Sequence, residues 1–149
     1  MIRKENYEEG IRVLASVVIQ RGKKILLINE RAEPYNGLWV IPQGYVKLEE
    51  TVGDAARREV LEELGVDVEL EGIVGVYDDF VKEGPKPTHY VIVAFLGRIK
   101  GSQEPRPTTE AIDFAWVDVS KGLPNVPSVI QRILYDVAKG EGRRVRIKL

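Results

Sequence analysis

Three glutamates in one short stretch are the residues best suited to do chemistry. On an α-helix, the spacing of Glu59, Glu62 and Glu63 places their carboxylates within an arc of roughly 100°. Like charges at these spacings destabilise a helix by roughly 0.2–0.5 kcal/mol per pair, so a cationic partner is expected. Carboxylate oxygens are ligands that Mg²⁺ prefers, which predicts a magnesium site on this helix face. The alternative is an acidic face that contacts only solvent.

The residues around these glutamates fit the same interpretation. Arg57 and Arg58 are expected to project outside the acidic arc. Arg58 precedes Glu62 by four residues, so it is also expected to brace that carboxylate from the side. Before the helix, residues 42–44 close a strand, and Gly44 lets the backbone approach a ligand closely. If this loop folds back, its carbonyls point toward the acidic residues.

The elements that must position these residues follow from the apolar pattern. Strands are predicted at residues 11–20, 24–29, 38–41, 66–77, 90–99 and 114–119, with an edge strand at 143–149. The acidic helix is predicted from the N-cap Thr51 to Leu64, ending at Gly65. A second helix is predicted over residues 125–139, with Pro127 in its first turn. This order predicts an α/β (α+β) fold, a mixed sheet with helices on both faces.

Composition limits the classes of protein that remain. The 149 residues fit one domain, 1–149, and 44% of them are hydrophobic. The 22 basic and 23 acidic residues nearly balance, which disfavours nucleic acid as the main partner. The absence of cysteine excludes disulfides and thiolate chemistry. Neither a signal peptide nor an apolar run long enough to span a membrane is recognised, so a cytoplasmic protein without a membrane partner is expected.

The stretch from Gly44 to Val66 resembles the Nudix box, G-x5-E-x7-R-E-U-x-E-E-x-G-U, where U is an aliphatic residue. All nine fixed positions match, and chance agreement is on the order of one in a million. They are Gly44, Glu50, Arg58, Glu59, Val60, Glu62, Glu63, Gly65 and Val66. The resemblance to these MutT-like enzymes implies a Nudix-type α/β/α sandwich and hydrolysis of a small nucleotide with Mg²⁺, or Mn²⁺ as its substitute.

The resemblance also implies roles for single residues. Glu59 and Glu63 are the implied metal ligands, with Glu62 as a third ligand or a water-orienting group. The carbonyl of Gln43 is expected to join them. Glu50 is expected to order the loop and helix or to bind an outer ion. Glu110 stands six residues before a tryptophan, where family members often carry a base or further ligand.

The implied substrate is a nucleoside diphosphate joined to another moiety, with a nucleoside monophosphate as one product. Residues 31–44 resemble the lead-in of a subgroup that acts on ADP-ribose, NADH and FAD. Arg31 is a candidate to meet a phosphate, and Tyr77 and Phe80 are candidates to stack on a base. Tyr77 lacks the following proline of many ADP-ribose enzymes, and Glu49 stands where glycine is frequent.

Two alternatives therefore stay open. The first is hydrolysis of nucleoside triphosphates or dinucleoside polyphosphates such as Ap4A. The second is a nucleotide sensor without catalysis, although such proteins typically lose box carboxylates that this chain keeps. The basic tail at residues 143–148 is expected to be a solvated edge, through which two copies can pair as a homodimer.

Overall fold

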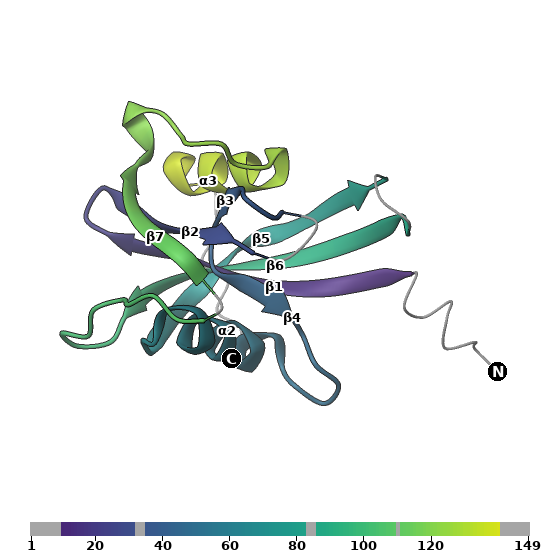
Figure 1. Cartoon of the computed structure of the whole chain (residues 1–149), viewed down its shortest axis with the longest axis horizontal. Coiled ribbons are helices and arrows are strands. Elements are labelled where there is room, and N and C mark those ends of the chain that lie inside the picture. Colours follow the sequence, from purple (N-terminus) through teal and green to yellow (C-terminus); the bar gives the residue numbers. More distant parts are fainter. Residues whose placement is uncertain (1–9, 32–34, 83–85, 110, 141–149) are drawn as a thin grey trace.

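In the computed structural model, which describes residues 10–31, 35–82, 86–109 and 111–140, a mixed sheet lies between two helices (Figure 1). The first half of the chain contains β1 (Ile11–Arg21), β2 (Lys24–Glu30), β3 (Trp39–Val40), β4 (Gln43–Tyr45) and α2 (Val52–Leu64). The second half contains β5 (Val68–Val81), β6 (Thr88–Ile99), β7 (Ala111–Asp118), the 3₁₀ helix η1 (Val119–Lys121) and α3 (Ser128–Lys139).

Strand β1 is the centre of the sheet. It pairs in parallel with β6 and antiparallel with β2 and β4. β5 pairs antiparallel with β6, while β3 and β7 pair antiparallel with β2. One parallel pairing among several antiparallel ones confirms the predicted mixed sheet. Among the strands of the described residues, β4 pairs only with β1, so its other side can meet side chains of a neighbouring element.

The two helices cover opposite faces of the sheet, as Figure 1 shows with α3 above and α2 below it. α2 contacts β1, β4 and β5, and α3 contacts β5. Residues 14–19 of β1 are all buried, although alternate side chains point to opposite faces. Burial on both faces is what a sheet between two helical layers requires. The predicted α/β/α architecture is confirmed.

Helix α2 has the boundaries that its local sequence predicts. The Thr51 hydroxyl oxygen accepts a hydrogen bond of 3.1 Å from the backbone N–H of Asp54, which caps the first turn. Ala55 and Ala56 are fully buried, so their small side chains let the helix lie close to the sheet. The helix ends at Gly65, whose φ of 68° is in the left-handed region that favours glycine.

Three features differ from the sequence prediction. Residues 43–45 form a strand rather than a loop after a strand, because they pair with residues 14–16 of β1. β5 continues to Val81, because it keeps pairing with β6 as far as Thr88. Pro127 has an extended ψ of 154° and is the N-cap of α3, so the helix begins at Ser128 instead of residue 125.

Two other expectations concern the end of the chain and the absence of membrane-spanning segments. The edge strand and basic tail predicted at residues 143–149 lie outside the described residues, so pairing of two copies there stays a prediction. Among the helices of the described residues, none combines the length and the apolar character needed to cross a membrane.

Candidate active site

The unpaired edge of β4 meets α2, and the first contact there is to Glu63. The backbone N–H of Gln43 donates a 3.1 Å hydrogen bond to Oε1 of Glu63, whose residue is only 3% exposed. The side chain of Gln43 is itself fixed, because its Oε1 accepts a 3.1 Å hydrogen bond from the buried Ser16 hydroxyl. A buried carboxylate is costly unless it is paired. The edge of β4 therefore holds Glu63 in one place.

Gly44 makes room for the carboxylate of Glu59. A Cβ atom at residue 44 would lie 2.0 Å from Cδ of Glu59 and 2.2 and 2.4 Å from its two oxygens. Any side chain at this position would thus occupy the space of the carboxylate. The box glycine is explained by this close approach of a side chain to the backbone, which only glycine permits.

Arg58 joins the remaining box residues. Its Nε and Nη2 donate to the two carboxylate oxygens of Glu50 at 2.7 and 2.9 Å. Its Nη1 lies 2.7 Å from Oε1 of Glu59 and 3.2 Å from Oε2 of Glu62. Its Nη2 also donates to the carbonyl of Tyr45 at 3.0 Å. One guanidinium therefore ties the loop, the edge strand and two helix carboxylates together.

These contacts confirm one expectation and correct another. Arg58 does contact Glu62, as its spacing predicts. The expectation that Arg58 projects outside the acidic arc is wrong, because its long side chain bends back among the carboxylates. The hydrogen bonds from Arg58 and from the backbone N–H of Lys47 lower the pKa of Glu50 to about 2. The bonds to Glu50 in turn raise the pKa of Arg58.

The chemistry of this cluster fits a divalent cation. Among the described residues, Arg58 pairs with Glu50, Glu59 and Glu62, while the fourth glutamate, Glu63, is buried against β4. The donors of the cluster are carboxylate oxygens, the type that Mg²⁺ prefers. Within the part of the chain that the structure describes, no three acidic or histidine side chains already converge as a preformed metal cluster. Glu59 and Glu63 lie one helical turn apart against β4 and are the best-placed pair.

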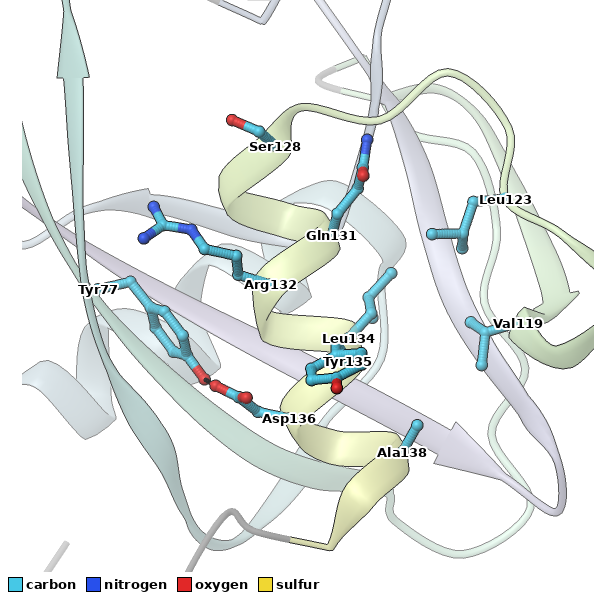
Figure 2. A pocket seen from close by; sticks show the side chains of 10 residues that line it. All are labelled: Tyr77, Val119, Leu123, Ser128, Gln131, Arg132, Leu134, Tyr135, Asp136 and Ala138. Atoms are coloured by element: carbon cyan, nitrogen blue, oxygen red, sulfur yellow. Dashed lines mark hydrogen bonds between the residues drawn. The ribbon is translucent and has the colours of Figure 1, made fainter.

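The sequence candidates for substrate binding do not gather at one surface. The hydroxyl of the buried Tyr77 donates to Asp136 of α3 at 2.6 Å, beside a hollow of about 760 Å³ along that helix (Figure 2). The pKa of Tyr77 is raised, chiefly by burial of the side chain and also by this hydrogen bond. Phe80 is three residues further along β5, so it points to the opposite face, where its ring lies 4.5 Å from that of His89.

Within the described part of the chain, Arg31 makes no contact with the cluster. Arg31 is exposed, and its backbone N–H donates to its neighbour Glu30 at 3.0 Å. Glu110 lies outside the described residues. Roles of Arg31, Tyr77, Phe80 and Glu110 in binding or catalysis therefore stay predictions.

Two residues that contact the site were not predicted from the sequence. Ser16 fixes Gln43, and its signal is a polar residue inside the otherwise apolar run of residues 13–19. Tyr45 supplies the carbonyl that Arg58 binds, and a backbone contact of this kind leaves no mark on residue type.

Glu49 is the only non-glycine residue with positive φ among those the structure describes, at 64°. The turn before α2 requires this left-handed conformation, which explains why glycine is frequent there in the family pattern.

Comparison with known proteins agrees with this geometry. Residues 10–136 match the family described as the NUDIX domain. The chain is 33% identical over 135 residues to a MutT-like protein of Streptomyces ambofaciens, covering 89% of this chain and 80% of the relative. It is 29% identical over 119 residues to the ADP-ribose pyrophosphatase of Methanocaldococcus jannaschii, covering 80% and 68%. The crystal structure of a MutT NUDIX hydrolase from Burkholderia pseudomallei superposes with a TM-score of 0.76 at 28% identity, covering 85% and 98%. The chain therefore belongs to the Nudix hydrolase family.

Proposed function

We propose that this Nudix hydrolase cuts the phosphoanhydride bond of a nucleoside diphosphate joined to a second moiety, with Mg²⁺ as its cofactor. The observation that carries the proposal is the edge of β4, where Gly44 makes room for Glu59 and the N–H of Gln43 fixes Glu63. These contacts hold two carboxylates in place, one helical turn apart. A cation that also binds diphosphate oxygens fits such a place.

The proposed ligands are the carboxylates of Glu59 and Glu63 with the carbonyl of Gln43, and Glu62 is available as a third. When bound, Mg²⁺ neutralises phosphate oxygens and makes water more acidic. Mn²⁺ is the expected substitute. Arg58 positions the carboxylates, and Glu50 fixes Arg58 through two hydrogen bonds.

Glu62 is the most accessible acid of the helix face, with its side chain 38% exposed against 14% for Glu59. This exposure suits a base that must meet water. We propose that the water oxygen attacks phosphorus, its proton passes to the Glu62 carboxylate and the anhydride P–O bond breaks. The products are a nucleoside monophosphate and a phosphorylated remainder. Glu110 is the second candidate for the base.

The proposed substrates are ADP-ribose or a dinucleotide-type diphosphate. The support is the resemblance of residues 31–44 and the likeness to the archaeal ADP-ribose pyrophosphatase. Nucleoside triphosphates and dinucleoside polyphosphates such as Ap4A are the competing substrates. A panel of ADP-ribose, NADH, FAD, Ap4A and dNTPs, each with Mg²⁺, separates these classes. Tight binding without turnover of any of them would instead indicate a nucleotide sensor.

Glu59→Gln and Glu63→Gln test the metal-binding proposal. Each replacement removes a charge and keeps the shape, and in Glu63→Gln the side-chain amide oxygen can still accept the N–H of Gln43. We expect kcat to fall at least 100-fold with little change in thermal unfolding, whereas Glu69→Gln is the matched control. Glu69 is an exposed acid of β5 that pairs with Arg98, away from the cluster. Full activity of Glu59→Gln, or loss of activity only through unfolding, would contradict the proposal.

A further inference from the structure

The loop between β6 and β7 contacts the last turn of α2, the turn that carries Glu62 and Glu63. The last four carbonyl groups of a helix have no partner within the helix. Two of these carbonyls in α2 find a partner in the loop. The Thr108 hydroxyl donates a 2.8 Å hydrogen bond to the carbonyl of Glu63, 45 residues away in the chain. The backbone N–H of Arg106 donates to the carbonyl of Leu64 at 3.0 Å.

Further contacts fix this loop on the chain that follows α2. The side-chain oxygen of Gln103 accepts a 2.9 Å hydrogen bond from the backbone N–H of Asp67. The backbone N–H of Lys100 donates to the carbonyl of Asp67 at 2.9 Å. Pro105, between these contacts and Arg106, is buried. The loop is therefore anchored along its length, and it can act as a fixed support for the end of the helix.

Arg106 also brings a positive charge to this end of α2. The last turn of the helix, all of which the structure describes, contains no basic residue. The negative end of the helix dipole lies there beside two glutamates, and a nearby cation stabilises such an end. A Cβ atom at Gly65 would lie 2.8 Å from Nε of Arg106. Gly65 therefore leaves room for the guanidinium as well as ending the helix.

Glu63 is held from two sides as a result. Its carboxylate accepts the N–H of Gln43 on β4, and its carbonyl accepts the hydroxyl of Thr108. Helix ends fray, and a frayed last turn would move the Glu63 carboxylate. Metal ligands tolerate little movement, because their distances to the ion must stay within about 0.2 Å of the preferred value. The contact with Thr108 therefore acts on the part of α2 where a shift matters most.

We propose that Thr108 is a positioning residue of the acidic cluster. Its hydroxyl holds the Glu63 carbonyl and thereby keeps the Glu63 carboxylate against the N–H of Gln43. This inference rests on the proposed function, in which Glu63 is a metal ligand. It adds to the site a loop that lies outside the box, and it makes metal affinity depend on a hydroxyl that acts only through Glu63.

Three variants and two measurements test this role. Thr108→Val removes the hydroxyl and keeps the shape, whereas Thr108→Ser keeps the hydroxyl. Thr109→Val is the matched control, because Thr109 is the next residue and is exposed. Hydrogen exchange by NMR in EDTA would follow the amide of Gln43, which donates to Glu63. The amide of Ile92, in the strand between β1 and β5, is the internal reference. Calorimetry with Mn²⁺ alone would measure metal affinity.

In Thr108→Val we expect the amide of Gln43 to exchange about 5-fold faster relative to Ile92, the effect of one lost hydrogen bond. Mn²⁺ is expected to bind about 10-fold more weakly, as when a group that supports a metal ligand is removed. Thr108→Ser and Thr109→Val should match wild type in both measurements.

Unchanged relative exchange of Gln43 in Thr108→Val would overturn the inference. Equal acceleration of the Gln43 and Ile92 amides would do so too, because it would show a loss of stability alone. Exchange in EDTA involves neither metal nor turnover, so its result does not depend on the proposed function. If wild type bound no Mn²⁺, the proposed metal site would be wrong, while the exchange of Gln43 would still decide whether Thr108 positions Glu63.

Discussion

Replacement of Gly44 by alanine tests the arrangement of the site most directly. The added methyl group would lie 2.0 Å from Cδ of Glu59. Carbon atoms in favourable contact are roughly 3.5–4.0 Å apart, so the carboxylate must move by about 1.5 Å or more. The atoms in the way are the flexible end of a side chain, so the carboxylate can turn aside while the fold persists.

The expected loss is therefore catalytic and only moderately structural. A displacement of about 1 Å in a reacting or positioning group costs on the order of 100-fold in rate. Glu59 would also lose its 2.7 Å contact with Arg58. We expect kcat for ADP-ribose with Mg²⁺ to fall at least 100-fold, while overpacking lowers the free energy of unfolding by about 1–3 kcal/mol.

Steady-state kinetics and urea unfolding of Gly44→Ala measure the two effects, and Gly101→Ala is the matched control. A Cβ at residue 101 meets nothing within 4 Å, but its φ of 57° is left-handed. That variant should lose about 1–2 kcal/mol of stability through backbone strain and keep its kcat. If Gly44→Ala keeps wild-type kcat, or if Gly101→Ala loses as much activity, the reasoning about Glu59 is wrong.

Three further predictions concern charge, metal and the helix α3. The ion pair of Glu50, whose pKa falls from 4.5 to about 2 on folding, should stabilise the protein fully above pH 4.5 and progressively less as the pH falls toward 2. The difference in unfolding free energy between wild type and Glu50→Gln should shrink over that range, and a constant difference would count against it. Chelation by EDTA should abolish hydrolysis, and Mg²⁺ or Mn²⁺ should restore it, with the circular dichroism spectrum unchanged throughout; activity that persists in EDTA would refute metal dependence. Tyr77→Phe removes the 2.6 Å hydrogen bond to Asp136 and should cost about 1 kcal/mol of stability with kcat preserved, since this bond lies away from the cluster; a large fall in kcat would show that Tyr77 acts in the site.

Much of the fold follows from local sequence. The cap at Thr51, the buried alanines and Gly65 fix α2 to the residue, because each acts within one or two turns of the helix. The apolar β-branched stretches likewise predict β1, β2 and β6 nearly at their observed bounds. β4 was missed because three residues carry too little periodicity, and it exists only through pairing with β1.

The candidate site, like the fold, follows partly from the sequence and partly from tertiary contacts. The spacing of the three glutamates and the box pattern determine which residues form the acidic face. The position of the Arg58 side chain was predicted wrongly. A helical wheel gives the direction of Cβ but not the position of the end of a long side chain. Its contacts with Glu50 and Tyr45 depend on how the loop and β4 fold back over the helix.

The sequence by itself determined the family, the mixed sheet between helices and the acids on one helix face, because these depend on residue types at fixed short spacings. Only the tertiary structure decided that Glu63 is held by the edge of β4, that Glu59 fills the space left by Gly44, and that the Tyr77 hydroxyl reaches Asp136 of α3. These features join segments far apart in the chain. Contacts of that kind are set by packing, which no local pattern encodes.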